Sequence, residues 1–185
     1  MSASASRRWL GALFALGAML PAIESGAADD IDCKEIDIGL ESYAAINMTC
    51  YSDHSRSGEG SSTWESLYAF DRQSLIFAAH AQAGIRTCLT AQEPKELAVG
   101  TGVFVSTTAW GDTFKSERFK VRRFEGTLES GEAQHCFAFS RPSDKVSRCV
   151  GFRHMLYGFY CDAGTSPIAE SRVDEVLGDI RRDYE

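Results

Sequence analysis

Apolar and polar residues alternate most regularly between Glu132 and Cys161. The run Arg141-Pro142-Ser143-Asp144 divides this stretch into two halves. Proline fixes φ at a value that suits a type I turn, and serine and aspartate suit the following corners. The pattern therefore predicts two antiparallel strands joined by a turn centred between Pro142 and Ser143.

In that register the hairpin has one apolar and one polar face, as a half-buried antiparallel pair requires. The apolar face carries Ala133, His135, Phe137, Phe139, Val146, Val150, Phe152, His154 and Leu156, and the polar face carries Glu132, Gln134, Cys136, Ser147, Cys149 and Arg153. Beyond Met155 both faces become apolar. We expect that end to run through the middle of a sheet, covered on both sides.

The rest of the chain is predicted to add short strands and one helix. Strands are expected at residues 43–51, 64–70, 97–107 and 119–128, with a Ser/Gly-rich loop at 52–62 and a turn at 93–96. Residues 75–89 fit either element, since their alanines suit a helix but their alternation and Gly84 favour a strand. We prefer the strand.

The clearest helix lies at the end of the chain. Ser166 is a suitable cap and Pro167 suits the first helical position. Ile168, Val173, Val176, Leu177 and Ile180 then follow the spacing of a single helical stripe. We predict a helix over residues 167–183.

The N-terminus has the pattern of a secretory signal peptide. Arg7-Arg8 precedes a short apolar run that ends at Pro21, and Gly26-Ala27-Ala28 offers small residues before a cut. Residues 1–28 are predicted to be removed and residues 29–185 to form one domain. An uncleaved anchor is the rival, but the apolar run is short for a membrane span.

The successive strands and the final helix predict an α+β fold. It is mainly an antiparallel β meander, as a curved sheet or barrel with the C-terminal helix packed on it. No internal repeat or long linker divides the domain.

Disulfide bonds are expected to cross-link this domain, because an even number of cysteines after a signal peptide indicates disulfides. The six are Cys33, Cys50, Cys88, Cys136, Cys149 and Cys161. The predicted register favours Cys136–Cys149, and Cys136–Cys161 is the runner-up. Without a Cys-x-x-Cys motif, neither a metal site nor a cofactor is predicted.

The charge balance argues against nucleic-acid partners. The chain has a formal net charge of −7, and removal of Arg7, Arg8 and Glu24 makes it −7 − 1 = −8. A basic cluster at residues 115–123 is interrupted by Glu117 and is interpreted as a solvated strand face. No stable membrane span is expected after the signal is removed.

No catalytic residue is assigned from the sequence. Gly-x-Ser-x-Gly and His-Glu-x-x-His are both missing from the sequence. The histidines are His54, His80, His135 and His154. His135 and His154 share the apolar face of the predicted hairpin, about 13 Å apart. That distance is too long for both to bind one metal ion or to act in one proton relay. A small secreted or periplasmic hydrolase that uses His135 or His154 with a nearby Ser or Asp is kept as the alternative function.

A ligand pocket is the preferred candidate site. A curved sheet can enclose a small molecule among aromatic residues, and the predicted lining is Phe137, Phe139, Phe152, His154, Tyr157 and Tyr160. The competing interpretations are that these aromatics fill the core, or that they form an exposed patch for a protein partner.

The tail Leu156-Tyr157-Gly158-Phe159-Tyr160-Cys161, followed by Pro167 and a short helix, resembles the tail of small uncharacterised exported bacterial proteins. The resemblance implies a cell-envelope location and a tail strand tied by a disulfide, and carries no activity. We expect a periplasmic or secreted, non-catalytic binding or interaction protein, whose partner is an unknown small ligand or an envelope protein.

Overall fold

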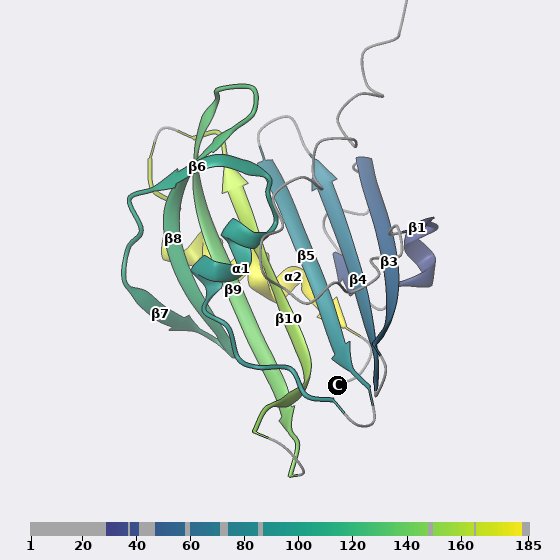
Figure 1. The fold of residues 1–185 in the computed structure, drawn as a ribbon. Helices are drawn as coiled ribbons and strands as arrows, with labels where there is room; N and C mark the ends of the chain where they lie inside the picture. Colours follow the sequence, from purple (N-terminus) through teal and green to yellow (C-terminus); the bar gives the residue numbers. More distant parts are fainter. Residues whose placement is uncertain are drawn as a thin grey trace, which may run out of the picture.

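The computed structural model describes residues 29–36, 38–40, 47–57, 60–70, 74–84, 87–147, 150–164 and 166–182. The predicted signal peptide lies outside these residues. Within them, alternating sequences pair into a mostly antiparallel sheet that curls into a half-barrel (Figure 1). The predicted fold class is confirmed.

The sheet of nine described strands is ordered β1-β3-β4-β5-β10-β9-β8-β6, and β7 also pairs with β8. In that order the strands are β1 (Asp29–Ile31), β3 (Asn47–Ser57), β4 (Gly60–Phe70), β5 (Ser74–Ala83), β10 (Phe152–Asp162), β9 (Ala133–Lys145), β8 (Phe119–Leu128) and β6 (Phe104–Thr108), with β7 at Thr113–Ser116. A second, two-stranded sheet joins β2 (Ile38–Leu40) to β11 (Ile180–Arg182). The helices are α1 (Pro94–Gly100), α2 (Glu170–Asp179) and the 3-10 turn η2 (Cys33–Glu35).

β10 lies in the middle of the large sheet, between β5 and β9. Its side chains are buried on both faces: Leu156 and Phe159 are 0 % exposed, and Tyr160 is 1 % exposed. This confirms the expectation that the tail strand is covered on both sides. The strand preferred for residues 75–89 is confirmed for residues 75–83, which belong to β5 beside β10, and β5 ends at Ala83.

Two apolar clusters cover the two faces of the sheet. On the face that we call the α2 face, helix α2 and strand β2 pack on Phe137, Phe139 and Tyr160. On the opposite face, the α1 face, α1 and the segment after it pack on Phe124 and Phe159. Figure 1 shows α1 in front of the sheet and α2 behind it.

The predicted turn at Pro142 is wrong. β9 continues to Lys145, which pairs with Phe152, and the turn follows, with the Val146 N–H donating to the Gly151 carbonyl at 3.2 Å. Cys136 therefore faces Cys161 rather than Cys149, a displacement of 161 − 149 = 12 positions. An even displacement keeps the paired residues of β9 and β10 on their predicted faces, because side chains alternate with a period of two. The face predicted to be polar is nevertheless buried, since Cys136 and Ala138 belong to an apolar cluster.

Pro142 fits inside a strand because β9 is unevenly paired. β10 pairs with β9 through Pro142, which lies opposite Met155, whereas the β8 register stops at Ser140. Proline lacks a backbone N–H and is tolerated where one side of a strand has no neighbour. Pro142 therefore removes no ladder hydrogen bond.

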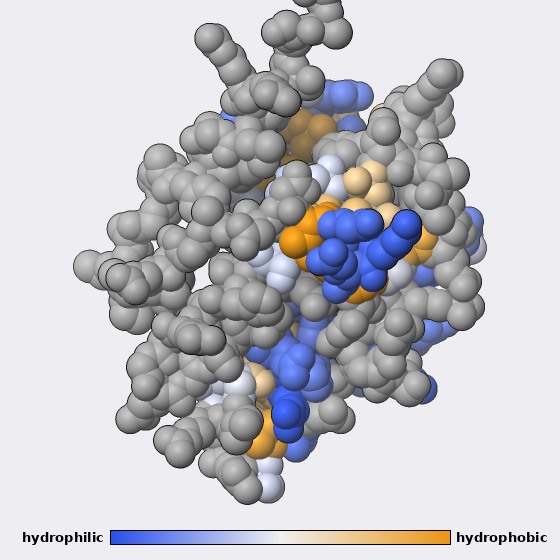
Figure 2. Space-filling view, turned by 90° about the vertical axis from the view of Figure 1, so that its right-hand side faces the viewer, coloured by the Kyte–Doolittle hydropathy of each residue, from blue (hydrophilic) through white to orange (hydrophobic). Residues whose placement is uncertain are grey.

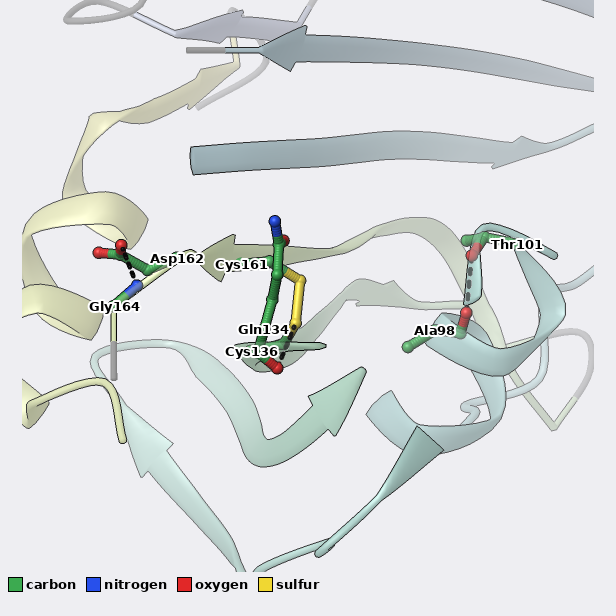
Figure 3. Close-up of a disulfide and its surroundings, with 7 residues drawn as sticks. All are labelled: Ala98, Thr101, Gln134, Cys136, Cys161, Asp162 and Gly164. Atoms are coloured by element: carbon green, nitrogen blue, oxygen red, sulfur yellow. Dashed lines mark hydrogen bonds between the residues drawn. A yellow bond between two sulfur atoms is a disulfide. The ribbon is translucent and has the colours of Figure 1, made fainter. Parts of the chain in front are cut away.

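The disulfides follow this register. Cys136 bonds to Cys161, so the runner-up pairing is confirmed and the preferred Cys136–Cys149 pairing is wrong. Figure 3 shows this bond between the two strands, with the Cys136 sulfur 3.7 Å from the carbonyl oxygen of Gln134. A second disulfide joins Cys33 to Cys50, and Cys88 is also disulfide-bonded. Cys149 lies outside the described residues.

The turn predicted at 93–96 and the first part of the strand predicted at 97–107 are wrong, because these residues form α1. Pro94 occupies the first turn, and the Glu96 side chain accepts a hydrogen bond from the Glu93 N–H at 3.4 Å, as in a capping box. The Thr101 hydroxyl donates to the Ala98 carbonyl at 2.7 Å (Figure 3), and Gly102 follows with φ +69°. These local hydrogen bonds outweigh the alternation of the valines.

The loop predicted at residues 52–62 is wrong for the part that is described. Residues 52–57 belong to β3 and residues 60–62 belong to β4, whose other side pairs with β5. Serine and glycine are poor strand formers, but pairing with neighbouring strands overrides this weak preference.

At the C-terminus the helix is shorter than the predicted 167–183. Ala169 is extended and precedes α2, and Ile180 leaves it to pair with Leu40. The predicted apolar stripe is buried against the sheet, with Val173, Val176 and Leu177 at its centre.

The outer edge of the sheet is formed by β1 and η2, which Cys33 ties to β3. This edge carries three exposed charged residues, Asp32, Lys34 and Glu35, and the half-buried Ile31. In Figure 2, which faces this edge, hydrophilic and hydrophobic residues lie next to each other among the described atoms. Charged residues at a sheet edge disfavour pairing with another chain. Within the described part of the chain, helices of the length and hydropathy needed to cross a membrane are not found.

Replacing Gly158 by alanine should destabilise the protein. An added Cβ would lie 2.0 Å from the Phe77 carbonyl oxygen and 2.8 Å from Cζ of Phe139. The carbonyl belongs to the neighbouring strand and has little room to move, so we expect a loss of about 1–3 kcal/mol or more in unfolding free energy. Urea unfolding of both proteins measures it.

Gly178→Ala is the matched control, because nothing lies within 4 Å of the Cβ position there. Alanine at this helical position should raise stability by about 0.5–1 kcal/mol. Equal midpoints for Gly158→Ala and the natural protein would contradict the close packing of β5 on β10.

Candidate functional site

Two histidines meet at one end of the α2 face. His80, on β5, is 1 % exposed, and His154, on β10, is half-buried. The Nε2 atom of His80 lies 3.2 Å from the Nδ1 atom of His154, and the ring centroids are 5.4 Å apart with an interplanar angle of 24°. One nitrogen donates a hydrogen bond and the other accepts it.

The pairing of β5 with β10 brings these two residues together. His80 lies opposite Leu156, and His154 lies opposite Gln82, so the histidines occupy diagonal positions on one face. Diagonal neighbours in an antiparallel pair are within reach of aromatic side chains. The two residues are 74 positions apart in sequence. A local pattern therefore gives no signal that they meet.

Polar residues lie near the histidine pair in the strand register, beside the buried Leu156. Gln82 faces His154 from β5, and the register places Glu65 of β4 directly opposite His80. Across β10, Arg141 of β9 lies opposite Leu156, with its guanidinium 5.0 Å from the ring centroid of Phe119. This end of the face contrasts with the other, where α2 packs on apolar residues.

The predicted aromatic pocket residues are divided between the core and the two faces. Phe137 and Phe139 are 0 % exposed and Tyr160 is 1 % exposed, under α2. Arg172 of α2 donates to the Tyr160 hydroxyl at 2.9 Å. Phe152, His154 and Tyr157 are half-buried, and Tyr157 packs on Phe77 on the α1 face.

Of the six predicted lining residues, only His154 belongs to the histidine pair. The others do not converge with it on one point, because Tyr157 lies on the other face and three of them fill the core. The sequence pattern placed His154 in the predicted lining and did not bring His80 to it. The signal that could have found His80 is its place as a polar residue between the apolar residues Ala79 and Ala81 of a buried strand.

The other histidine of the hydrolase alternative lies far from this pair. His135 faces Asp162 in the β9–β10 register, eight positions along β10 from His154, or roughly 27 Å. Its Nδ1 atom is 3.8 Å from Glu125. The predicted 13 Å separation is therefore too short, because it depended on the wrong register. The described contact of His154 is an imidazole, whereas a nucleophile relay needs a hydroxyl and a carboxylate in sequence.

The α1 face carries a second polar cluster, around the half-buried ring of Trp110. The ring stacks on Phe124, with centroids 4.3 Å apart, and its N–H bonds to Thr107. Lys95 Nζ and Arg122 Cζ lie 5.6 and 5.7 Å from the ring centroid. The ring is thus engaged by its own neighbours, as a structural cation–π arrangement.

No model of a known protein family matches the chain, and neither does any curated protein or solved structure. The geometry of the histidine pair and the composition of the chain are therefore what bear on function.

Proposed function

We propose that this chain is an exported, non-catalytic binding protein of the bacterial cell envelope, with its ligand site at the histidine pair. The observation that carries the proposal is the contact between His80, which is almost fully buried, and His154, which is half-buried. His154 gives access from solvent, and the sheet holds His80 in a fixed position beneath it.

Burial makes this pair costly as a purely structural contact. A polar group moved from water into a protein interior needs a hydrogen-bond partner to offset its desolvation. Apolar residues of similar size would fill the same space without that requirement, as Leu156 does between His80 and Arg141. A pair of imidazoles at the open end of a rigid sheet is instead well suited to bind a ligand.

Export is supported by the signal-peptide pattern and by the cross-links. Disulfides persist in oxidising compartments, and the bonds Cys33–Cys50 and Cys136–Cys161 both join parts of this one domain. The resemblance of the tail to exported bacterial proteins points the same way.

The binding function is favoured over the hydrolase alternative by the contacts of the two histidines that the alternative would use. His154 contacts an imidazole, and the described ion pair of His135 is with Glu125 at 3.8 Å. Neither contact supplies a nucleophilic hydroxyl.

Export predicts a new N-terminus. When the full chain is expressed in a bacterium with a general secretion pathway, N-terminal sequencing should find Asp29 first, in the periplasmic fraction or the medium. Ala28→Arg should block cleavage, because the −1 position requires a small residue. An uncut chain in the cytoplasm would contradict the proposal.

The ligand site predicts localised changes in nuclear magnetic resonance spectra of the processed protein. We would add Zn²⁺, inorganic phosphate, acetate and glucose separately. At least one should shift the imidazole signals of His80 and His154, and His154→Gln should abolish the response. His135→Gln, also half-buried but at the other end of the sheet, should retain it. If no probe moves these signals, or if the response survives His154→Gln, the proposed site is wrong.

A further inference from the structure

We propose that the ligand of this site is a divalent transition-metal ion, bound by His80 Nε2 and His154 Nδ1. This inference rests on the proposed function and names its ligand class. The two nitrogens lie 3.2 Å apart. With metal–nitrogen bonds of about 2.0–2.1 Å, that separation gives a nitrogen–metal–nitrogen angle of about 100°, between the square-planar value of about 90° and the tetrahedral value of about 109°.

The existing contact already directs the two nitrogens at each other. In the metal-free protein a single proton lies between them, carried by one ring and accepted by the other. A metal ion displaces that proton and lies beside the line between the two nitrogens, when His80 carries its proton on Nδ1 and His154 carries its proton on Nε2. Both rings then stay neutral, and each offers a lone pair to the ion.

The rest of the coordination is open. Among the described residues, no group of three or more His, Cys, Asp or Glu side chains could hold a metal ion. Gln82, whose side chain carries an amide oxygen, lies opposite His154 in the strand register. Because His154 is half-buried, water molecules reach the ion and complete its coordination shell. Two fixed imidazoles with exchangeable oxygen ligands suit Zn²⁺, Cu²⁺ or Ni²⁺.

Charge favours a cation over an anion here. The chain has a formal net charge of −7, which raises the local concentration of cations. Arg141 lies across Leu156 from His80 in the register, and its guanidinium lies over the Phe119 ring. The cysteines among the described residues are disulfide-bonded, so they do not compete as thiolate ligands.

The test uses the processed full-length protein, freed of metal by a chelator. Isothermal titration with ZnCl₂ should give one site per chain. Electron paramagnetic resonance with one equivalent of CuSO₄ should show coupling to two imidazole nitrogens. His80→Gln and His154→Gln should each weaken binding by at least about tenfold and remove that coupling, and His135→Gln should leave both unchanged. His80 is buried, so His80→Gln could fail to fold. The test is therefore decided by His154→Gln, because His154 is only half-buried.

Three results would overturn the inference: no binding at millimolar metal, binding unchanged in His154→Gln, or equal loss in His135→Gln. Failure of the inference is separable from failure of the binding function. If phosphate or acetate shifts the His154 signals while Zn²⁺ and Cu²⁺ do not bind, the site binds an anion and only the metal assignment fails. If none of these probes acts at the pair, both proposals fail.

Discussion

β10 pairs with β9 on one side and β5 on the other, and the rest of the structure depends on this double pairing. Because both faces of β10 are buried, the strand contributes to the core under α2 and to the core under α1. Gly158 allows the neighbouring strands to approach, since the Phe77 carbonyl and the Phe139 ring occupy the space that a side chain would need. The Cys136–Cys161 bond then holds the β9 side of this arrangement covalently.

The candidate site is a consequence of the same pairing. β5 and β10 are distant in sequence, and only their register sets His80 and His154 on diagonal positions of one face. The apolar end of that face is closed by α2, whereas the polar end keeps the two imidazoles in contact. The register of β5 and β10 therefore holds two imidazole nitrogens 3.2 Å apart.

Much of the architecture follows from local patterns. The alternation of residues 119–128 predicted β8 with its observed bounds, and the continuous apolar run after Met155 predicted a strand in the middle of a sheet. The error in register was an even number of residues, so paired residues of β9 and β10 kept their predicted sides, but the side predicted to be polar is buried around Cys136. The predicted turn was wrong: Pro142 has the chemistry of a turn residue, but a stretch of β9 that pairs with β10 and not with β8 also accepts it.

The site could be predicted only in part, for a physical reason. Strand pairing over 74 residues is decided by the packing of whole faces, which no local window contains. His154 was assigned to the apolar face of the predicted hairpin, whereas His80 lies in a segment that fitted either a helix or a strand. The helix α1 was missed for the opposite reason, since its local hydrogen bonds overrode a pattern that favoured a strand.

Peptide mapping of the unreduced protein tests the register most directly, because the two candidate registers require different cross-links. Pairing of Lys145 with Phe152 requires a linked pair of peptides that contain Cys136 and Cys161, and this is the result that we predict. A link between Cys136 and Cys149 would restore the turn at Pro142, move β10 along both neighbours and separate His80 from His154. That result would contradict the account of the fold and of the site together.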